Sequence, residues 1–112
     1  MISLEDRHRL HQFLMLELAI RYVRMDLDAF GTMKCANVFV PFMENFLQHL
    51  IEQCQQEKQY FAQKQIRLIK WEKLDAYFSQ VTIATAGEDA VFKYANQAVK
   101  THVEEILKQQ LK

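Results

Sequence analysis

The N-terminal part of the chain carries the pattern that most constrains the fold, a long helix that is apolar on two sides. Apolar residues recur there at alternating spacings of three and four, which indicates one continuous helical stripe formed by Phe13, Leu16, Ile20, Val23, Leu27 and Phe30. A second stripe lies roughly 140° around the helix and consists of Met15, Leu18, Tyr22 and Met25. A helix with two apolar sides must either be enclosed in a core or be shared with another subunit.

Local signals mark both ends of this helix. Ser3 begins a variant of a capping box and is followed by acidic residues that suit the positive end of a helix. Gly31 can adopt the left-handed backbone conformation that often ends a helix. The predicted helix spans about residues 4–30, and a helix of about 25 residues is about 38 Å long. Few partners in a chain of 112 residues can cover both sides of it, so we expect the second stripe to contact a second copy of the chain.

Two further helices are predicted. Residues 31–40 form a connector, because a residue that precedes a proline avoids the α region and Val38–Val40 should therefore be extended. Pro41 suits the first turn of a helix over about residues 41–64, antiparallel to the first. A second capping-box pattern at Thr85–Glu88 predicts a third helix over about residues 87–111.

The segment between the last two helices has a different texture. Residues 66–71 and 77–85 are rich in β-branched and aromatic side chains, which favours a two-stranded antiparallel hairpin over about residues 66–85. Its turn, around residues 73–75, has neither Gly nor Asn, so a short helix over residues 71–80 remains an alternative. The sequence predicts a single domain over residues 1–112 that is mainly α with a small hairpin (α+β), and an all-α bundle is the alternative fold.

Composition excludes several classes of protein. Half of the residues are hydrophobic and 14 basic residues balance 14 acidic ones, which is unlike a disordered chain or a globally basic nucleic-acid binder. Two glycines and one proline are too few for an all-β domain, and two cysteines are too few for a disulfide scaffold. No apolar run approaches about 20 residues, so no membrane span is expected. We read the cysteines as free thiols in a reducing cytoplasm.

Chemistry-bearing residues form no recognisable site in the sequence. His8 and His11 lie one helical turn apart and could bind one metal ion together, but a zinc site needs three or four ligands and no further ligand stands at a recognised spacing. His49 and His102 read as boundary residues beside apolar stripes. No glycine-rich phosphate loop, nucleophile motif or converging carboxylate pair is present. We therefore expect neither catalytic residues nor a cofactor or metal.

One local concentration of charge suggests an alternative function. Residues 58–74 contain five basic residues against one acidic residue, a net charge of +4. A basic β-ribbon with an aromatic side chain can approach a nucleic-acid groove or stack on bases, and the residues for such contact are Lys64, Arg67, Lys70, Trp71 and Lys73. The competing interpretation is that lysines protect an exposed strand edge from aggregation.

The order of these segments resembles a known group of small proteins. The long apolar helix LELAIRYVRMDLDAF, the connector ending in Pro41, the basic stretch QIRLIKWEKLD and the terminal VFKYANQAVKTHVEEIL are similar to the YhjD-like proteins of Bacillus species and related phages. The resemblance implies a cytoplasmic setting in a Gram-positive bacterium or phage and brings no catalytic motif. Members usually continue the basic stretch with more lysines, whereas Glu72 and Asp75 interrupt it here.

We therefore expect a non-enzymatic protein–protein interaction module that self-associates through the second apolar face of the first helix. The alternative is a small nucleic-acid-binding regulator that uses the basic segment 58–74.

Overall fold

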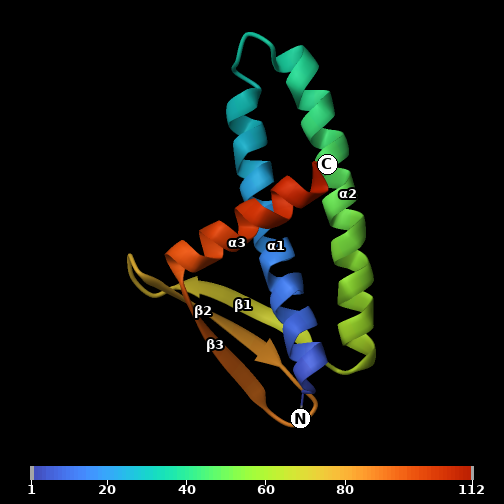
Figure 1. Ribbon diagram of the computed structural model, residues 1–112, viewed down its shortest axis with the longest axis vertical. Helices are drawn as coiled ribbons and strands as arrows, with labels where there is room; N and C mark the ends of the chain where they lie inside the picture. The colour runs from blue at the N-terminus through green and yellow to red at the C-terminus, as the bar shows by residue number, and fades with distance from the viewer. Residues whose placement is uncertain (1, 112) are drawn as a thin grey trace.

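The protein is an α+β domain in which two long helices, a small sheet and a third helix share one core (Figure 1). The computed structural model describes residues 2–111. The elements in chain order are α1 (Leu4–Phe30), α2 (Ala36–Gln63), β1 (Arg67–Lys73), β2 (Phe78–Ala84), β3 (Asp89–Ala95) and α3 (Asn96–Gln110). The strands form one antiparallel sheet in the order β1-β2-β3. The predicted α+β class is confirmed, and the sheet excludes the all-α bundle.

Helix α1 lies at the centre of the molecule. In Figure 1 it runs antiparallel to α2, passes over the sheet with its N-terminal half and is crossed by α3. Both predicted stripes are buried in its middle, where the enclosed side chains are Leu10, Phe13, Leu14, Met15, Leu16, Leu18, Ala19, Ile20 and Val23. Helix α2 covers one side, while the sheet and α3 cover the other. The N-terminal cap is the predicted one, since Ser3 Oγ accepts from the N–H of Asp6 at 3.1 Å.

The second helix begins earlier than predicted. Helix α2 starts at Ala36, so Val38–Val40 are helical and Pro41 lies within the helix. Pro41 is the sixth residue of the helix and has no N–H to donate to the carbonyl of Asn37. Asn37 is exposed, so water can reach this part of the helix. The extra turn brings Phe39 to a ring-centroid distance of 6.3 Å from Phe30 and closes the tip of the helical hairpin.

The sheet has a third strand where the sequence predicted the start of a helix. Residues 89–95 form β3, and α3 starts only at Asn96. The hydrogen bond predicted for the cap is present, because Thr85 Oγ1 accepts from the N–H of Glu88 at 3.3 Å. It closes the β2–β3 turn instead, since Ser and Thr hydroxyls make the same local bonds in turns and in helix caps.

The β1–β2 hairpin is confirmed, and its turn is closed without glycine. Asp75 Oδ1 accepts from the N–H groups of Tyr77 at 2.7 Å and Phe78 at 2.8 Å. The amide of Asn96 donates to the carbonyls of Asp75 and Ala76 at 3.2 and 3.1 Å. A side chain from the start of α3 therefore holds the turn, and the alternative helix over residues 71–80 is wrong.

The left-handed stop predicted for the first helix at Gly31 is wrong, and a left-handed residue ends α2 instead. Gly31 has φ −59° and ψ −19°, which is right-handed. Gln65, just after α2, has φ 61°. The N–H of Ile66 bonds to the carbonyl of Phe61 at 2.9 Å and that of Gln65 to Ala62 at 3.0 Å, which is a Schellman motif. Burial of both Ile66 and Phe61 in the core accounts for the tight exit from α2.

Because α1 is enclosed, alanine substitutions at two of its leucines should differ greatly in their effect on the free energy of unfolding. Leu14 is fully buried and Leu4 is exposed. Leu14→Ala leaves a cavity and should lower the free energy of unfolding by about 3 kcal/mol, whereas Leu4→Ala should change it by less than about 0.5 kcal/mol. Urea denaturation followed by circular dichroism measures both. Equal effects would contradict the enclosed position of α1.

Candidate functional site

The second apolar stripe of α1 is buried in its first half and exposed in its second half. Met15 and Leu18 are buried under the sheet and α3, with Leu18 only 6 % exposed. Tyr22 and Met25 lie beyond that cover, and Met25 is 67 % exposed. The first two residues are therefore part of the core of the single chain and are not accessible to a partner. Only the last two remain on a surface.

The basic segment presents its residues on two faces of β1. A bulge at Ile69 places Leu68 opposite Ile83 and Trp71 opposite Val81, so Leu68 and Trp71 both face the core. The sequence had grouped Trp71 with Arg67, because strict alternation without a bulge would put them on one face. The Trp71 ring packs against Tyr94 at a centroid distance of 5.7 Å. It is thus not placed to stack on a base.

Two of the predicted cationic contacts already have carboxylate partners. Lys64 Nζ lies 2.6 Å from Asp6 Oδ2, and Lys70 Nζ lies 3.7 Å from Glu72 Oε2. Arg67 and Lys73 are exposed. With the aromatic turned inward and these cations partly neutralised, the geometry does not favour a nucleic-acid surface on β1.

The two sets of predicted residues meet in one groove between α1, α3 and the sheet. Leu18, Tyr22 and Met25 line it from α1, and Trp71 and Lys73 line it from β1, around a volume of about 720 Å³. Among residues 2–111, the indole N–H of Trp71 is a buried side-chain donor with no hydrogen-bond partner. The rim carries both acidic and basic groups, so the groove has no dominant charge.

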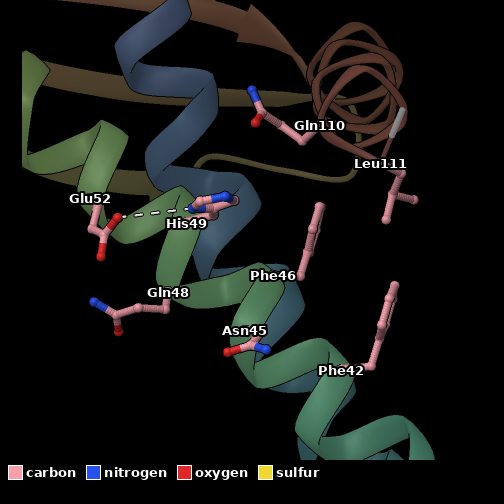
Figure 2. Close-up of a pocket in the computed structure, with 8 residues that line it drawn as sticks. All are labelled: Phe42, Asn45, Phe46, Gln48, His49, Glu52, Gln110 and Leu111. Carbon is pink, nitrogen blue, oxygen red and sulfur yellow. Dashed lines mark ion pairs between the residues drawn. The ribbon is translucent and has the colours of Figure 1, made fainter.

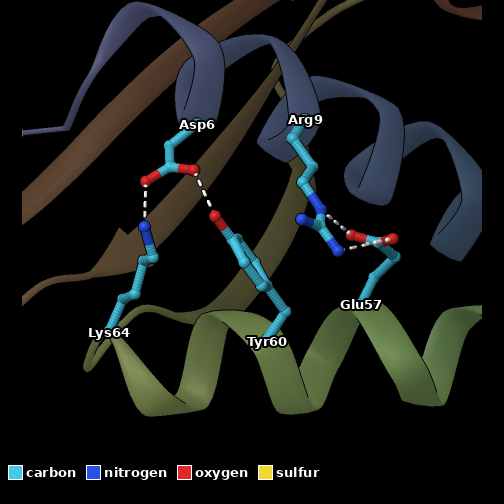
Figure 3. Close-up of polar contacts among 5 residues, drawn as sticks. All are labelled: Asp6, Arg9, Glu57, Tyr60 and Lys64. Atoms are coloured by element: carbon cyan, nitrogen blue, oxygen red, sulfur yellow. Dashed lines mark hydrogen bonds and ion pairs between the residues drawn. The ribbon is translucent and has the colours of Figure 1, made fainter.

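A polar cluster locks the lower end of the helical hairpin (Figure 3). Asp6 on α1 accepts from the Tyr60 hydroxyl at 2.7 Å and from Lys64 at 2.6 Å. Arg9 donates to both oxygens of Glu57 at 2.7 and 3.3 Å, and its guanidinium carbon lies 3.5 Å from the centre of the Tyr60 ring. Hydrogen bonds from Lys64 and then Tyr60 hold the pKa of Asp6 below its ordinary value.

The opposite end of the hairpin, which we call the helical arm (residues 24–49), projects beyond the sheet and α3 (Figure 1). No residue of the arm is buried, although the structure describes all of them. Several of its large apolar side chains are exposed to solvent, namely Met25, Met33, Val38, Phe39 and Phe42. Large exposed apolar patches mark interaction sites in soluble proteins, so the arm is a candidate for one.

A groove lies at the base of the arm, between α2 and the end of α3. Figure 2 shows Phe42 and Phe46 projecting from the same side of α2 towards Leu111. The groove has a volume of about 590 Å³. Next to the groove a reciprocal amide pair joins α2 to α3, since Gln53 and Gln110 donate to each other at 2.8 and 3.1 Å. Phe42 thus belongs both to the exposed apolar side chains of the arm and to the groove at its base.

The histidines are arranged in a way that the sequence could not show. His102 on α3 lines the same pocket as His8 and His11 on α1, together with Tyr94 on β3. No group of three or more His, Cys, Asp or Glu side chains within the described part of the chain is arranged to hold a metal ion. The spacing along α1 brought His8 and His11 together in the sequence analysis. His102 and Tyr94 come from elements that are far away in sequence.

A family model described as "YhjD protein" matches residues 1–112. The chain belongs to the YhjD family. This confirms the resemblance inferred from the order of its segments. No curated protein matches the chain, and no solved structure matches it. Across residues 2–111, none of the helices combines the length and apolar character needed to cross a membrane.

The second apolar stripe of this YhjD-family protein is buried at Leu18 and exposed at Met25, so the same substitution should affect stability differently at the two residues. Leu18→Glu puts a carboxylate into the core and should lower the free energy of unfolding by about 3 kcal/mol or more. Met25→Glu, on the same stripe but exposed, should leave the fold intact. Far-UV circular dichroism and thermal melting measure both variants. A Leu18→Glu protein with an unchanged melting temperature would show that Leu18 is not a core residue.

The polar cluster predicts a pH-dependent contribution from Asp6. The folded-state pKa of Asp6 lies below its ordinary value of 3.8, so the ionised carboxylate stabilises the fold above that pH. Asp6→Asn should therefore be less stable than the unmodified chain at pH 7, and the difference should shrink as the pH falls below 3.8. Urea denaturation at several pH values measures it. Asp28→Asn, on the exposed arm, is the control, and a pH-independent Asp6 difference would refute the assignment.

Proposed function

We propose that this YhjD-family protein is a non-enzymatic interaction module that self-associates through the helical arm. The observation that carries the proposal is the complete lack of buried residues between positions 24 and 49. The predicted contact surface on α1 shifts accordingly towards the C-terminal end of the helix, where Tyr22 and Met25 remain accessible.

The energetics of the arm favour a partner. Ordering a residue costs roughly 1–2 kcal/mol of backbone entropy, and burial of apolar side chains is the main term that offsets it. In the arm no side chain is more than partly buried, and the partly buried ones are Leu27, Phe30, Ala36, Val40, Met43, Phe46 and Leu47. Two such hairpins packed face to face form a four-helix bundle, which removes the outer apolar side chains from water as well.

The outer face of α2 is suited to pairing with itself. Val38, Phe42 and Phe46 follow one another at a spacing of four, and so form one stripe along the helix that is exposed at Val38 and Phe42 and partly buried at Phe46. In an antiparallel pair of α2 helices with a twofold axis at Phe42, Val38 of one copy lies opposite Phe46 of the other. Each copy thus supplies both Val38 and the groove at the base of the arm that receives the partner's Val38. A twofold interface requires this reciprocity.

Charge presents no obstacle to this pairing. The arm contains two basic and three acidic residues, and none of them lies between Cys35 and Met43. The formal net charge of the whole chain is zero, so two copies experience no long-range repulsion. We choose a second copy of the chain as the partner for this reason.

We also propose a cytoplasmic setting. Cys35 is an exposed free thiol at the tip of the arm, and Cys54 is a buried one. Burial and the nearby Glu17 carboxylate, which accepts from the Cys54 thiol at 3.1 Å, raise the pKa of Cys54 to about 12. Exposed free thiols persist in reducing compartments.

Substitution at the centre of the proposed interface tests the proposal. Phe42→Glu would place two carboxylates next to each other across the twofold axis, and we expect the dissociation constant of the dimer to rise at least about tenfold. Phe42 is 59 % exposed, so the fold of the single chain should survive. Sedimentation velocity over a concentration series measures the mass, with circular dichroism as the check on folding.

The matched control is Tyr77→Glu, which adds the same charge at an exposed aromatic residue of the β1–β2 turn, away from the arm. This variant should associate as the unmodified chain does. The proposal would be overturned if the unmodified chain stayed monomeric up to about 200 μM. Its free energy of association would then be weaker than about 5 kcal/mol. Equal dissociation by both variants would place the interface elsewhere.

A further inference from the structure

A second feature of the molecule, at the far end of α1 from the arm, is a pocket between α1, β3 and α3. It has a volume of about 310 Å³, and its lining includes His8, His11, His102 and Tyr94. We call it the histidine pocket. Met15 and Val99 form its apolar part, and both belong to the core. A pocket of this size, with an apolar wall and a few converging polar groups, is typical of a site for a small molecule.

Its wall is held in place by contacts between α1 and β3. The His11 ring lies 5.5 Å from the Tyr94 ring, edge to face, and 5.4 Å from the Phe92 ring. His11 Nδ1 and the Tyr94 hydroxyl are hydrogen-bonded to each other. The pocket is therefore formed before any ligand arrives, and a ligand need not meet the cost of ordering it.

The same hydrogen bond fixes which nitrogen of His11 carries the proton. Burial raises the pKa of Tyr94 to about 12, while burial, together with Arg7, His8 and His102, lowers the pKa of His11. Both groups are thus neutral near pH 7. A neutral phenol is the stronger acid and a neutral imidazole nitrogen the stronger base, so Tyr94 donates to Nδ1. The proton of His11 then resides on Nε2, which becomes a donor for a ligand.

The polar side chains around the pocket are suited to an anion. His8 on α1 and His102 on α3 line it beside His11. Arg7, a cation, lies near enough to act on the pKa of His11. The lining contains no Asp or Glu, and Gln12 adds a side-chain amide. The pocket therefore offers N–H donors beside an apolar wall, with no carboxylate in its lining to repel an anion.

We propose that the histidine pocket binds a small organic acid, with its carboxylate against His8, His11 and His102 and its apolar body against Met15 and Val99. Charge-assisted hydrogen bonds to a carboxylate are stronger than neutral ones, and the wall covers the part of the ligand that water solvates poorly. This site is separate from the arm and does not depend on self-association. Each of the two proposals can fail without the other.

The experiment uses benzoate as the probe, with benzamide as its uncharged counterpart and inorganic phosphate as the charge without an apolar body. Nuclear magnetic resonance of the imidazole groups reports binding, and a dissociation constant of about 1 mM is expected for a ligand of this size. Benzoate should shift the signals of His8, His11 and His102. His49 on α2, the fourth histidine of the chain, lies outside the pocket and serves as the internal control.

Substitutions and a second readout sharpen the result. His102→Gln should weaken benzoate binding roughly tenfold, since it removes one charge-assisted contact, while His49→Gln should leave it unchanged. Trp71 is the single tryptophan of the chain and packs against Tyr94, so its fluorescence should change with the same dissociation constant.

Three outcomes would overturn the proposal. Equal binding of benzamide and benzoate would show a plain apolar pocket with no role for the imidazoles. Equal binding of phosphate and benzoate would show an anion site that does not recognise the apolar body. Benzoate shifts of the same size at His49, or no shifts at any histidine, would show that the pocket does not select an organic acid.

Discussion

Between residues 10 and 23, α1 carries apolar side chains around most of its circumference, and these must be removed from water. One neighbouring helix covers a stripe of about 100°, so a second layer is needed for the rest. The structure meets this need with α2 on one side and with the sheet and α3 on the other. The three-stranded sheet gains its stability in return, because its inner face packs on α1 and α3.

The hairpin of α1 and α2 has two ends with opposite characters. The lower end is closed by the cluster of Asp6, Tyr60 and Lys64 and by the Arg9–Glu57 pair, and it sits against the sheet. Among the described residues, no side-chain hydrogen bond or ion pair joins the two helices at the upper end, and the end of α3 lies only beside its base. The proposed self-association and the proposed ligand site thus occupy different ends of one long helix. A chain of this size can hold two surfaces without their overlapping.

Parts of the fold followed from local patterns because local interactions decide them. The helical stripes, the Ser3 cap and the β1–β2 hairpin were predictable, since each depends on residues close together in sequence. Residues 89–95 were misassigned because the Thr85–Glu88 hydrogen bond serves a helix cap and a hairpin turn equally well. The pairing of β3 with β2 gives those residues a strand's hydrogen bonds, and that pairing is a tertiary contact. The bulge at Ile69 likewise became visible only from the register with β2.

The sequence by itself determined that the first helix has two apolar sides and that the chain is α+β, because side-chain periodicity is a property of consecutive residues. Only the tertiary structure decided how far along α1 the cover extends, so Leu18 became a core residue while Met25 stayed on a surface. It also decided that His102 and Tyr94 join His8 and His11 around one pocket. Such groupings depend on how elements that are distant in sequence pack together, and the spacing of residues along the chain does not reveal that packing.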